Sequence, residues 1–499
     1  MINRNNLWKG IIVIVVVFFL FGNIDGWQNN DDEGTALYAA WRISVNEQPY
    51  IDFTTTKAPL FLQLGGTAVK FLGRNLFLLR SFMATLILGS SIFFAWSIKQ
   101  VWSEQSSWII WANLLLMPQF YHISRVFRAD TLMLAFMLVG LGFLILENKY
   151  QKRYLLALSG ICFGLGFLAK ALGVMPMFGA GLWLLIRMRH HRKWKHGIVD
   201  GLILTVAALA TTAVGYLLSE WRFPGTIEMV LGVEGSGNSA TLLSTVPNCY
   251  GNEINWTLCR LTKGSLAWLA IYYNNWPLIF SITPFIMLIL YQHKPNPAWI
   301  FGTQIIASLP IFFISGPVFA RYLIYAIPSL IALWWTSIEQ FDMPWFPKTN
   351  KPSILIPALL FPLLLGWQTV LLFQSYEQDT SNLANWIAEN TPTNAIVLSD
   401  YAEIPFHAGR QSIPSQGGIG YGWAVSGLIT GAQIQTELEA TNAQAIILHI
   451  PEDPSEPAHM YNMLDFEEFY QYVQNNYKLQ DVRLRTEQRL EVWLKSESP

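Results

Sequence analysis

Eleven long apolar runs occupy most of the first 373 residues, and they constrain the fold more than any other feature of the sequence. Each is close to the roughly 20 residues that a helix needs to cross a bilayer. The chain is 52% hydrophobic and only 13% charged, whereas about a quarter of the residues of a soluble domain are charged. We therefore predict a polytopic α-helical membrane protein. The predicted spans are 8–24, 76–97, 107–122, 131–146, 154–170, 172–187, 198–218, 275–291, 298–316, 318–337 and 353–373.

The basic residues of the predicted loops indicate the orientation. Lys and Arg gather in alternate loops, most densely at 187–195, and the positive-inside rule places such loops and the N-terminus in the cytoplasm. Anionic-lipid binding is a second interpretation of 187–195, which we consider weaker. The outer side then holds residues 25–75, 123–130, 219–274 and the tail after 373. We expect a plasma (inner) membrane protein that contacts membrane lipids. The net charge of −1 argues against a nucleic-acid partner.

The outer loop 25–75 carries the first candidate site. Asp31, Asp32 and Glu33 follow the first span directly, and carboxylates beside a bilayer are costly unless they are solvated or used. A hydrated loop with incidental acids is the alternative. Periodic apolar residues predict interfacial helices over 33–45 and 60–72. Between them, a turn with Thr54 and Pro59 can hold Lys57 against the acids. A carboxylate base and an anion-binding lysine suit transfer from a phosphate leaving group.

These residues resemble a known family. Asp32-Glu33, Tyr38, Pro49-Tyr50, Asp52 and Lys57-Ala58-Pro59-Leu60 are similar to the first outer loop of the GT-C membrane glycosyltransferases, in particular the protein O-mannosyltransferases and the lipid A aminoarabinose transferases. Three further motifs match in order and in topological placement. They are Arg128-Ala129-Asp130-Thr131, Gly164-Leu165-Gly166-Phe167-Leu168-Ala169-Lys170, and Arg321-Tyr322-Leu323 leading to Pro328. Thr56 departs from the pattern, because the aminoarabinose transferases have an acidic residue before the lysine.

The resemblance implies a role for each matched residue. Asp32 would be the general base that deprotonates an acceptor hydroxyl, which attacks the anomeric carbon with inversion. Glu33 would orient the acceptor or support the loop. Lys57 and Arg321, assisted by Lys170, would neutralise the leaving lipid phosphate. Substrate contacts are expected from a further set, which is Arg128, Asp130, Tyr322, Tyr50 and Asp52. The donor would be a polyprenyl-phosphate sugar, so no nucleotide and no other cofactor is expected, and a divalent cation is left open.

Several of these charged residues have a purely structural alternative. Arg128 and Asp130 can form an ion pair at the end of a span. Lys170 can extend to the interface between two short helices, unless the two runs that meet there form one long helix. Arg321 begins a span on the outer side, against the positive-inside trend, which favours a phosphate role. Arg80 lies inside the second span, and we expect its charged end to extend outward to the interface, with a contribution to the site as the alternative.

The outer loop 219–274 is long for a connection between two spans. The loop, whose part 232–239 is Gly- and Ser-rich, is expected to act as a lid over the site or to be a plain insertion. Cys249 and Cys259 share this loop, and two cysteines on an oxidising face indicate a disulfide. The eight His residues form no ligand spacing typical of a metal site, so we assign none.

After residue 373 the composition becomes that of a soluble domain. Helices are predicted over 379–389, 428–440 and 466–476, and strands over 395–400, 445–450 and 489–494. This alternation predicts a small α/β domain with a partly parallel sheet. Its glycine-rich segment 416–422 resembles a phosphate-binding loop only loosely. We expect the domain to bind the acceptor or to act as a structural cap.

Together these observations predict two parts. Residues 1–374 form a GT-C-like transmembrane domain of about eleven spans, and residues 375–499 form an extracytoplasmic α/β domain. The predicted function is transfer of a hexosyl or pentosyl group from a polyprenyl-phosphate donor to a lipid, glycan or protein hydroxyl on the outer face. A transporter or flippase of lipid-linked sugars is the alternative. Transporters are usually built from repeated halves, and the sequence shows no such repeat.

Overall fold

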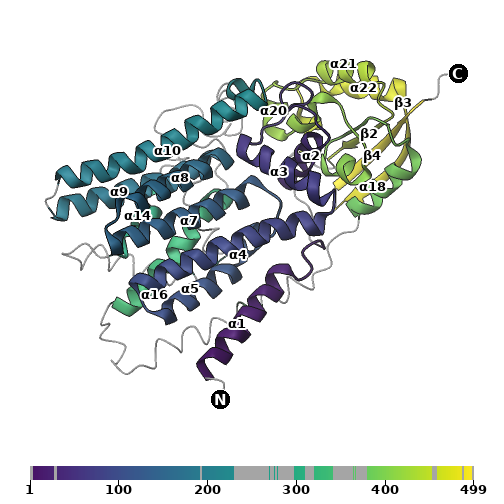
Figure 1. Cartoon of the computed structure of the whole chain (residues 1–499). Helices are drawn as coiled ribbons and strands as arrows, with labels where there is room; N and C mark the ends of the chain where they lie inside the picture. Colours follow the sequence, from purple (N-terminus) through teal and green to yellow (C-terminus); the bar gives the residue numbers. More distant parts are fainter. Residues whose placement is uncertain are drawn as a thin grey trace.

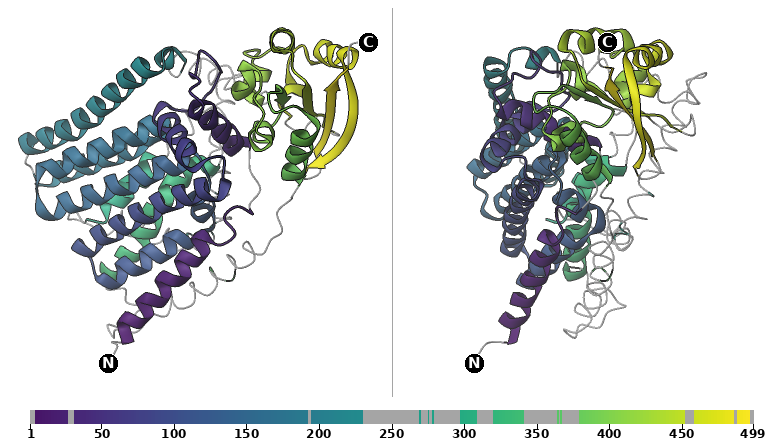
Figure 2. Two further views of the ribbon diagram at one scale, coloured as in Figure 1. Left: turned by 45° about the vertical axis from the view of Figure 1, so that its right-hand side comes forward. Right: turned by 90° about the vertical axis from the view of Figure 1, so that its right-hand side faces the viewer.

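A bundle of helices and a mixed α/β part make up the molecule (Figure 1). The computed structural model describes residues 4–26, 31–191, 194–229, 297–308, 320–340, 379–451, 458–485 and 488–496, and the single positions 269, 275, 278, 364 and 366. The helices of the bundle run roughly side by side, and the α/β part covers one end of them in both views of Figure 2. Helices α2 (Asp31–Ser44) and α3 (Pro59–Leu72) lie where the two parts meet.

Among the described residues, four helices are long and apolar enough to cross a membrane. They comprise α4 (Leu76–Val101), α7 (Ala129–Tyr150), a segment Ala171–His190 that includes most of α9 (Val174–His191), and α10 (Trp194–Arg222). Three shorter apolar helices contribute to the same bundle. The first lies within α1 (Arg4–Phe21), the second is α8 (Arg153–Ala169), and the third, Leu323–Thr336, begins in the 3₁₀ turn η5 (Ala320–Ala326) and continues into α16 (Ile327–Gln340). Helix α14 (Trp299–Ala307) packs against α9 and α16. The predicted spans 275–291 and 353–373 lie outside the described residues, apart from single positions.

The prediction of one continuous span over 107–122 is wrong. Helix α5 (Glu104–Leu116) ends before Met117, which is extended, and α6 (Pro118–Ser124) then begins at Pro118. Proline has no N–H and clashes with the preceding turn of a helix, so it starts a new helix more readily than it continues one. The runs that meet at Lys170 form two helices, because Lys170 is extended between α8 and the short 3₁₀ turn Ala171–Gly173.

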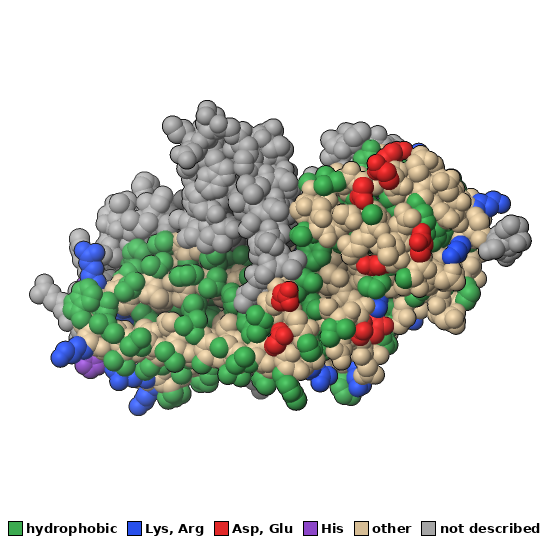
Figure 3. Space-filling view, turned by 90° about the horizontal axis from the view of Figure 1, so that it is seen from above, with side chains coloured by type: hydrophobic (Ala, Val, Ile, Leu, Met, Phe, Trp, Pro, Cys, Tyr) green, Lys and Arg blue, Asp and Glu red, His purple; other side chains and the backbone are tan. Residues whose placement is uncertain are grey.

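Lipid-facing and buried surfaces separate along the bundle. Helix α7 is buried along most of its length, whereas α10 exposes a row of large apolar residues that includes Leu202, Leu209 and Leu217. Such an exposed apolar surface is expected where lipid tails take the place of water. In Figure 3 the apolar side chains gather over the bundle, and a group of Lys and Arg side chains lies at the end away from the α/β part.

The C-terminal part contains a four-stranded sheet in the order β1-β2-β4-β3. β1 (Val397–Ser399) pairs parallel with β2 (Ala445–His449), and β4 (Gln488–Lys495) pairs antiparallel with both β2 and β3 (Tyr477–Arg485). The other elements are helices and turns around this sheet: α18 (Asp379–Asn390), α19 (Glu403–Ala408), η6 (Pro414–Gly418), α20 (Tyr421–Val425), α21 (Gly431–Thr441), η7 (Met460–Asn462) and α22 (Phe466–Asn476). Apolar residues of β1 and β2 point to both faces and are fully buried, as expected for strands covered on two sides.

Candidate active site

The N-terminal turn of α2 brings two acids to the end of the bundle. Asp32 and Glu33 lie in the first turn of this helix, where the positive end of the helix dipole favours carboxylates. Successive residues of a helix point about 100° apart, since one turn takes 3.6 residues. The side chain of Asp32 is accordingly 35% exposed, while that of Glu33 is completely buried. The two neighbouring acids therefore have different environments.

Asp32 is part of a cluster of five charged side chains. Arg128 Nη2 lies 2.9 Å from Asp32 Oδ2 and 3.2 Å from Asp130 Oδ2. Lys57 Nζ lies 3.8 Å from Asp32 Oδ1, and Lys170 Nζ lies 2.6 Å from Asp130 Oδ1. We call these residues the charged cluster. Its three cations and two carboxylates leave a formal excess of one positive charge.

The folding of α7 and α8 explains why distant residues meet in this cluster. The two helices pack side by side, and a short connection joins the end of α7 to the start of α8. They therefore run in opposite directions, which places Arg128, just before α7, beside Lys170, just after α8. Arg128 and Asp130 form the ion pair that the sequence offers as an alternative to a site role. Because this pair is part of the charged cluster, the two interpretations are compatible.

The accessible members of the cluster differ from the buried ones. Arg128 and Asp130 are each 4% exposed, whereas Lys57, Lys170 and Asp32 keep part of their side chains open to solvent. Burial lowers the pKa of Lys57 below its usual value, and the positive charges of Arg128 and Lys170 lower it further, against the opposite effect of Asp32 and Asp130. An arriving anion would relieve this repulsion between cations. One carboxylate and two lysines of the cluster are thus partly accessible to a charged molecule from solvent.

Glu33 serves a different arrangement from Asp32. Arg80 of α4 donates from Nε and Nη2 to the two carboxylate oxygens of Glu33, at 2.8 and 2.7 Å, and from Nη1 to the carbonyl of Ile24 at 2.8 Å. The backbone N–H of Phe127 donates to Glu33 at 2.8 Å. Burial alone would raise the pKa of Glu33. The positive charges of Arg80 and Arg128 and the hydrogen bonds from Arg80 and Phe127 bring this pKa below its usual value. The contacts tie α2 to α4 and to the segment before α7.

The expectation that Arg80 extends outward is wrong. Its side chain is completely buried, because the Glu33 carboxylate and the Ile24 carbonyl provide partners inside the protein. An apolar span in the sequence gives no sign of a partner 47 residues away. Extension to the interface is the default only where such a partner is absent.

The remaining predicted residues lie around the cluster rather than in it. The Tyr50 hydroxyl donates to the Lys57 carbonyl at 3.3 Å, so it contacts the backbone of the Lys57 loop. Asp52 accepts from the Gln48 N–H at 2.7 Å in an exposed turn. Arg321 and Tyr322 belong to η5 (Ala320–Ala326), which packs against α6, and only their backbone is described. Cys249, Cys259 and most of the predicted lid lie outside the described residues.

Sequence reasoning missed the contacts that join the site to the C-terminal part. The Tyr38 hydroxyl accepts from Arg42 Nη1 at 2.6 Å and from the Ser412 N–H at 3.0 Å. In the sequence, Tyr38 stands out only as a match to the family pattern. Arg42 follows it by four residues, which is the spacing of side chains that meet on one helix face. That spacing is the one signal in the sequence that could have indicated the pair.

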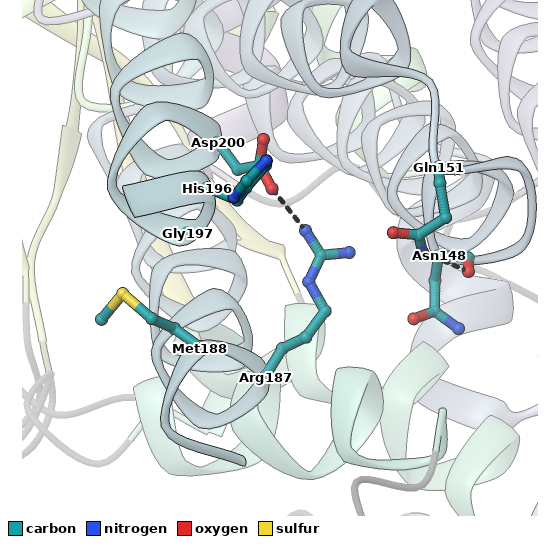
Figure 4. A pocket seen from close by; sticks show the side chains of 7 residues that line it. All are labelled: Asn148, Gln151, Arg187, Met188, His196, Gly197 and Asp200. Atoms are coloured by element: carbon teal, nitrogen blue, oxygen red, sulfur yellow. Dashed lines mark hydrogen bonds and ion pairs between the residues drawn. The ribbon is translucent and has the colours of Figure 1, made fainter. Parts of the chain in front are cut away.

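A second polar group lies at the opposite end of α7. A pocket of about 330 Å³ lies between the ends of α7, α9 and α10. Figure 4 shows the residues that line it, which are Asn148, Gln151, Arg187, Met188, His196, Gly197 and Asp200. Arg187 pairs with Glu147 at 2.7 Å and with Asp200 at 3.1 Å, and Arg153 also pairs with Asp200. In these ion pairs, the two positive charges of Arg153 and Arg187 balance the two negative charges of Glu147 and Asp200. Among the residues that the structure describes, no group of three His, Cys, Asp or Glu residues is placed to hold a metal ion.

Comparison with known proteins agrees with the resemblance seen in the sequence. Residues 57–216 match the family model of dolichyl-phosphate-mannose-protein mannosyltransferases. ArnT from Cupriavidus metallidurans bound to undecaprenyl phosphate is 15% identical, with a TM-score of 0.62, and 97% of each chain is covered. The same protein in the apo state gives 14% identity, a TM-score of 0.63 and 98% coverage of both chains.

An archaeal structure is similar over almost the whole chain. The oligosaccharyltransferase of Archaeoglobus fulgidus tethered with an acceptor peptide is 14% identical with a TM-score of 0.56, covering 98% of this chain and 74% of that one. No curated protein matches the sequence. The family-model match and the shared fold confirm the resemblance to the GT-C membrane glycosyltransferases.

Proposed function

We propose that this chain, with its GT-C fold, transfers a sugar from a polyprenyl-phosphate donor to an acceptor hydroxyl on the outer face of the plasma (inner) membrane. The charged cluster is the observation that carries the proposal. It combines one partly exposed carboxylate with partly exposed lysines, and its excess positive charge suits a phosphate. The similar ArnT structure holds undecaprenyl phosphate, which supports a lipid phosphate as the leaving group here.

Asp32 is the proposed general base. Its carboxylate accepts the proton of the acceptor hydroxyl while the hydroxyl oxygen attacks the anomeric carbon. The bond from that carbon to the phosphate oxygen breaks on the opposite side, so the configuration inverts. The phosphate leaves with the bonding electron pair. Fixed cations aimed at the developing charge stabilise such a transition state more than the ground state.

Lys57 and Lys170 are the proposed phosphate ligands, together with Arg321. Both lysines keep part of their side chains exposed beside Asp32. Arg128 is buried between the two carboxylates, so we assign it the orientation of Asp32. Glu33 supports the loop, which is the second of the two roles that the family resemblance implies, because its carboxylate is occupied by Arg80 and the Phe127 N–H.

The membrane orientation of the site is also a proposal. The charged cluster lies at the end of α7 that faces the C-terminal part, and the basic segment around Arg187 lies at the other end. The positive-inside rule places the basic end in the cytoplasm, which puts the cluster and the C-terminal α/β domain outside. An odd number of spans, about eleven as predicted from the sequence, places the N-terminus in the cytoplasm and the C-terminal domain outside it.

The transporter alternative predicts a polar path through the bundle. Between Asp130 and Glu147, however, α7 carries no charged residue and is buried along most of its length. The charged groups at its two ends are therefore about 25 Å apart along the axis, at 1.5 Å for each residue. This separation favours chemistry at one face over passage of a sugar phosphate.

An assay of the purified protein in detergent distinguishes sugar transfer from transport. Transport cannot be observed there, because no membrane separates two compartments. We would supply lipid-linked sugars extracted from membranes and acceptor material from cells that lack this chain. A transferase releases polyprenyl phosphate and adds one sugar to the acceptor, both visible by mass spectrometry. A transporter leaves all substrates chemically unchanged, and that result would overturn the proposal.

A further inference from the structure

The glycine-rich segment of the C-terminal part packs directly against the loop that carries Lys57. The N–H of Thr54 donates to the Pro414 carbonyl at 2.8 Å. A Cβ atom on Gly417 would lie 2.2 Å from the Thr54 carbonyl oxygen, and one on Gly418 would lie 3.1 Å from Thr54 Cγ2. Real Cβ atoms do not approach backbone oxygen so closely. The segment can therefore touch this loop only because it has no side chain at Gly417.

The same segment also holds the helix that carries Asp32. The N–H of Ser412 donates to the Tyr38 hydroxyl at 3.0 Å, and Arg42 Nη1 donates to the Ser412 carbonyl at 3.2 Å. All three residues are buried. Residues 412–418 thus contact α2 at one end and the Lys57 loop at the other. We call these residues the bridging segment.

The bridging segment is itself fixed to the sheet. The side-chain oxygen of Gln416 accepts from the Ser399 N–H at 2.9 Å and from the Ser412 hydroxyl at 2.7 Å, and its amide nitrogen donates to the Ser399 carbonyl. Ser399 is the last residue of β1, and Gln416 is 1% exposed. The buried Gln416 side chain cannot move without losing these hydrogen bonds. The position of the bridging segment, and of the Lys57 loop packed against it, is therefore fixed relative to the sheet.

We propose that the bridging segment sets the position of Lys57 relative to Asp32, so that the C-terminal part takes part in binding the donor phosphate. Gly417 is then a positioning residue that acts through Lys57. The inference rests on the proposed function, since it assumes that Lys57 binds phosphate. Placement errors of about 1 Å in a site of this kind can cost up to about 100-fold.

The test measures binding of undecaprenyl phosphate to the full chain in detergent. Gly417→Ala should weaken binding about tenfold or more, because the added methyl group moves the Thr54 loop. Gly420→Ala is the matched control from the same loop. A Cβ there would meet its nearest atom only at 3.9 Å, and Gly420 has an extended backbone that alanine also adopts. We expect its affinity and melting temperature to equal those of the wild type.

A double variant shows whether Gly417 acts through Lys57. Lys57→Ala alone should weaken binding, and adding Gly417→Ala to it should cause little further loss, since coupled residues are not additive. A double variant whose loss of affinity equals the product of the two single losses would overturn the inference. If Gly417→Ala lowers the melting temperature, Tyr38→Phe decides the matter. It removes only the Tyr38 hydroxyl, which accepts from the Ser412 N–H and from Arg42 Nη1, and unchanged binding in that variant would also overturn the inference.

The outcomes separate this inference from the proposed function. Failure of the wild type to bind undecaprenyl phosphate, or equal binding by Lys57→Ala, contradicts the phosphate role and with it the proposed function. Weaker binding by Lys57→Ala with normal binding by Gly417→Ala contradicts only the role of the bridging segment.

Discussion

Asp32 and Glu33 are neighbours in the chain, yet the fold gives them separate tasks. Asp32 is partly exposed beside Lys57, and Glu33 is buried against Arg80. The sequence indicates that both acids matter, because carboxylates after a span are costly. It cannot divide their tasks, since the partners of Glu33 come from Arg80 and from the Phe127 N–H, 47 and 94 residues away.

Removing the charge of Glu33 should damage stability rather than chemistry. Glu33→Gln leaves the Arg80 guanidinium buried without its counter-charge, and breaking a buried ion pair in this way costs about 3–5 kcal/mol. Asp32→Asn should change the melting temperature much less, because Asp32 is partly exposed. Thermal unfolding of both variants in detergent checks the difference. A Glu33→Gln protein of normal stability with lost turnover would assign Glu33 a direct catalytic role instead.

The low pKa of Lys57 makes a prediction about alkaline pH. A lysine binds phosphate only while protonated, so affinity should fall as the pH rises through a pKa that burial and the neighbouring cations place below 10.5. Lys57→Arg keeps its charge at all these pH values. Binding of undecaprenyl phosphate should therefore weaken at lower pH in the wild type than in Lys57→Arg. Parallel pH profiles of the two proteins would show that the charge of Lys57 does not control binding.

Helix α19 links the C-terminal part to α2. A Cβ on Gly34 would lie 2.3 Å from Glu403 Oε2, so the two helices meet closely two residues after Asp32. Phe406 contacts Trp41 edge to face at 6.2 Å, and Arg74 donates to the Phe406 carbonyl at 2.7 Å. The C-terminal part is thus held to the bundle by helix packing as well as by the bridging segment.

Acid should loosen this contact through His407. Burial lowers the pKa of His407 to about 4, with a further lowering by Arg80 and Arg74 against the opposite effect of Glu33. Between its ordinary 6.5 and about 4 the unfolded imidazole binds a proton that the folded one does not. The free energy of unfolding therefore falls as the pH drops through this window, by at most about 1.4 kcal/mol for each pH unit.

His407→Gln provides the comparison. The variant should lose less thermal stability than the wild type when the pH is lowered from 7 to 4.5, measured on the full chain in detergent. An identical loss in both proteins would mean that His407 does not contribute to acid sensitivity.

Local periodicity predicted the elements that depend on local sequence. Helices expected over 33–45 and 60–72 are observed as Asp31–Ser44 and Pro59–Leu72. The periodicity of apolar residues did not predict the structure correctly where a single residue interrupts a helix or a strand. Pro118 divides one predicted span, and β3 was missed because a bulge between Leu479 and Asp481 shifts the alternation of its side chains.

The contacts that build the site could not be predicted in the same way. Ser412 and Tyr38 are 374 residues apart, and their bond joins a backbone N–H to a side chain. Backbone groups are the same at every position, so no residue type marks such a partner. In the sequence, the glycines at 417 and 418 indicate only a loose resemblance to a phosphate-binding loop. Their structural reason is close packing against Thr54.

Charged side chains gather at the two ends of the helix bundle. The charged cluster lies near the C-terminal part, and Arg153 and Arg187 lie at the far end of the bundle, where Figure 3 shows a group of Lys and Arg side chains. This separation supports the proposed orientation, in which the far end faces the cytoplasm.

Reporter fusions test that orientation. A reporter fused after Phe373 should be active only outside the cytoplasm, and one inserted in 187–195 only inside it. Activity of both on the same side would mean that the number of spans between them differs by one from the proposal. The assignment of the site to the outer face would then be lost.

If Asp32 is the base of a sugar transfer at a lipid phosphate, the Asp32→Asn protein should transfer sugar slowly, and its initial rate of transfer is the measurement to make. The reaction contains purified protein, lipid-linked sugars from membranes and acceptor material from cells lacking the chain. The substitution keeps size and removes the proton acceptor, so the rate should fall by about 10²–10⁴. Undecaprenyl phosphate should bind normally, and Asp31→Asn should transfer at the wild-type rate. Near-normal transfer by Asp32→Asn would contradict the account, and a large loss for Asp31→Asn alone would move the base by one residue.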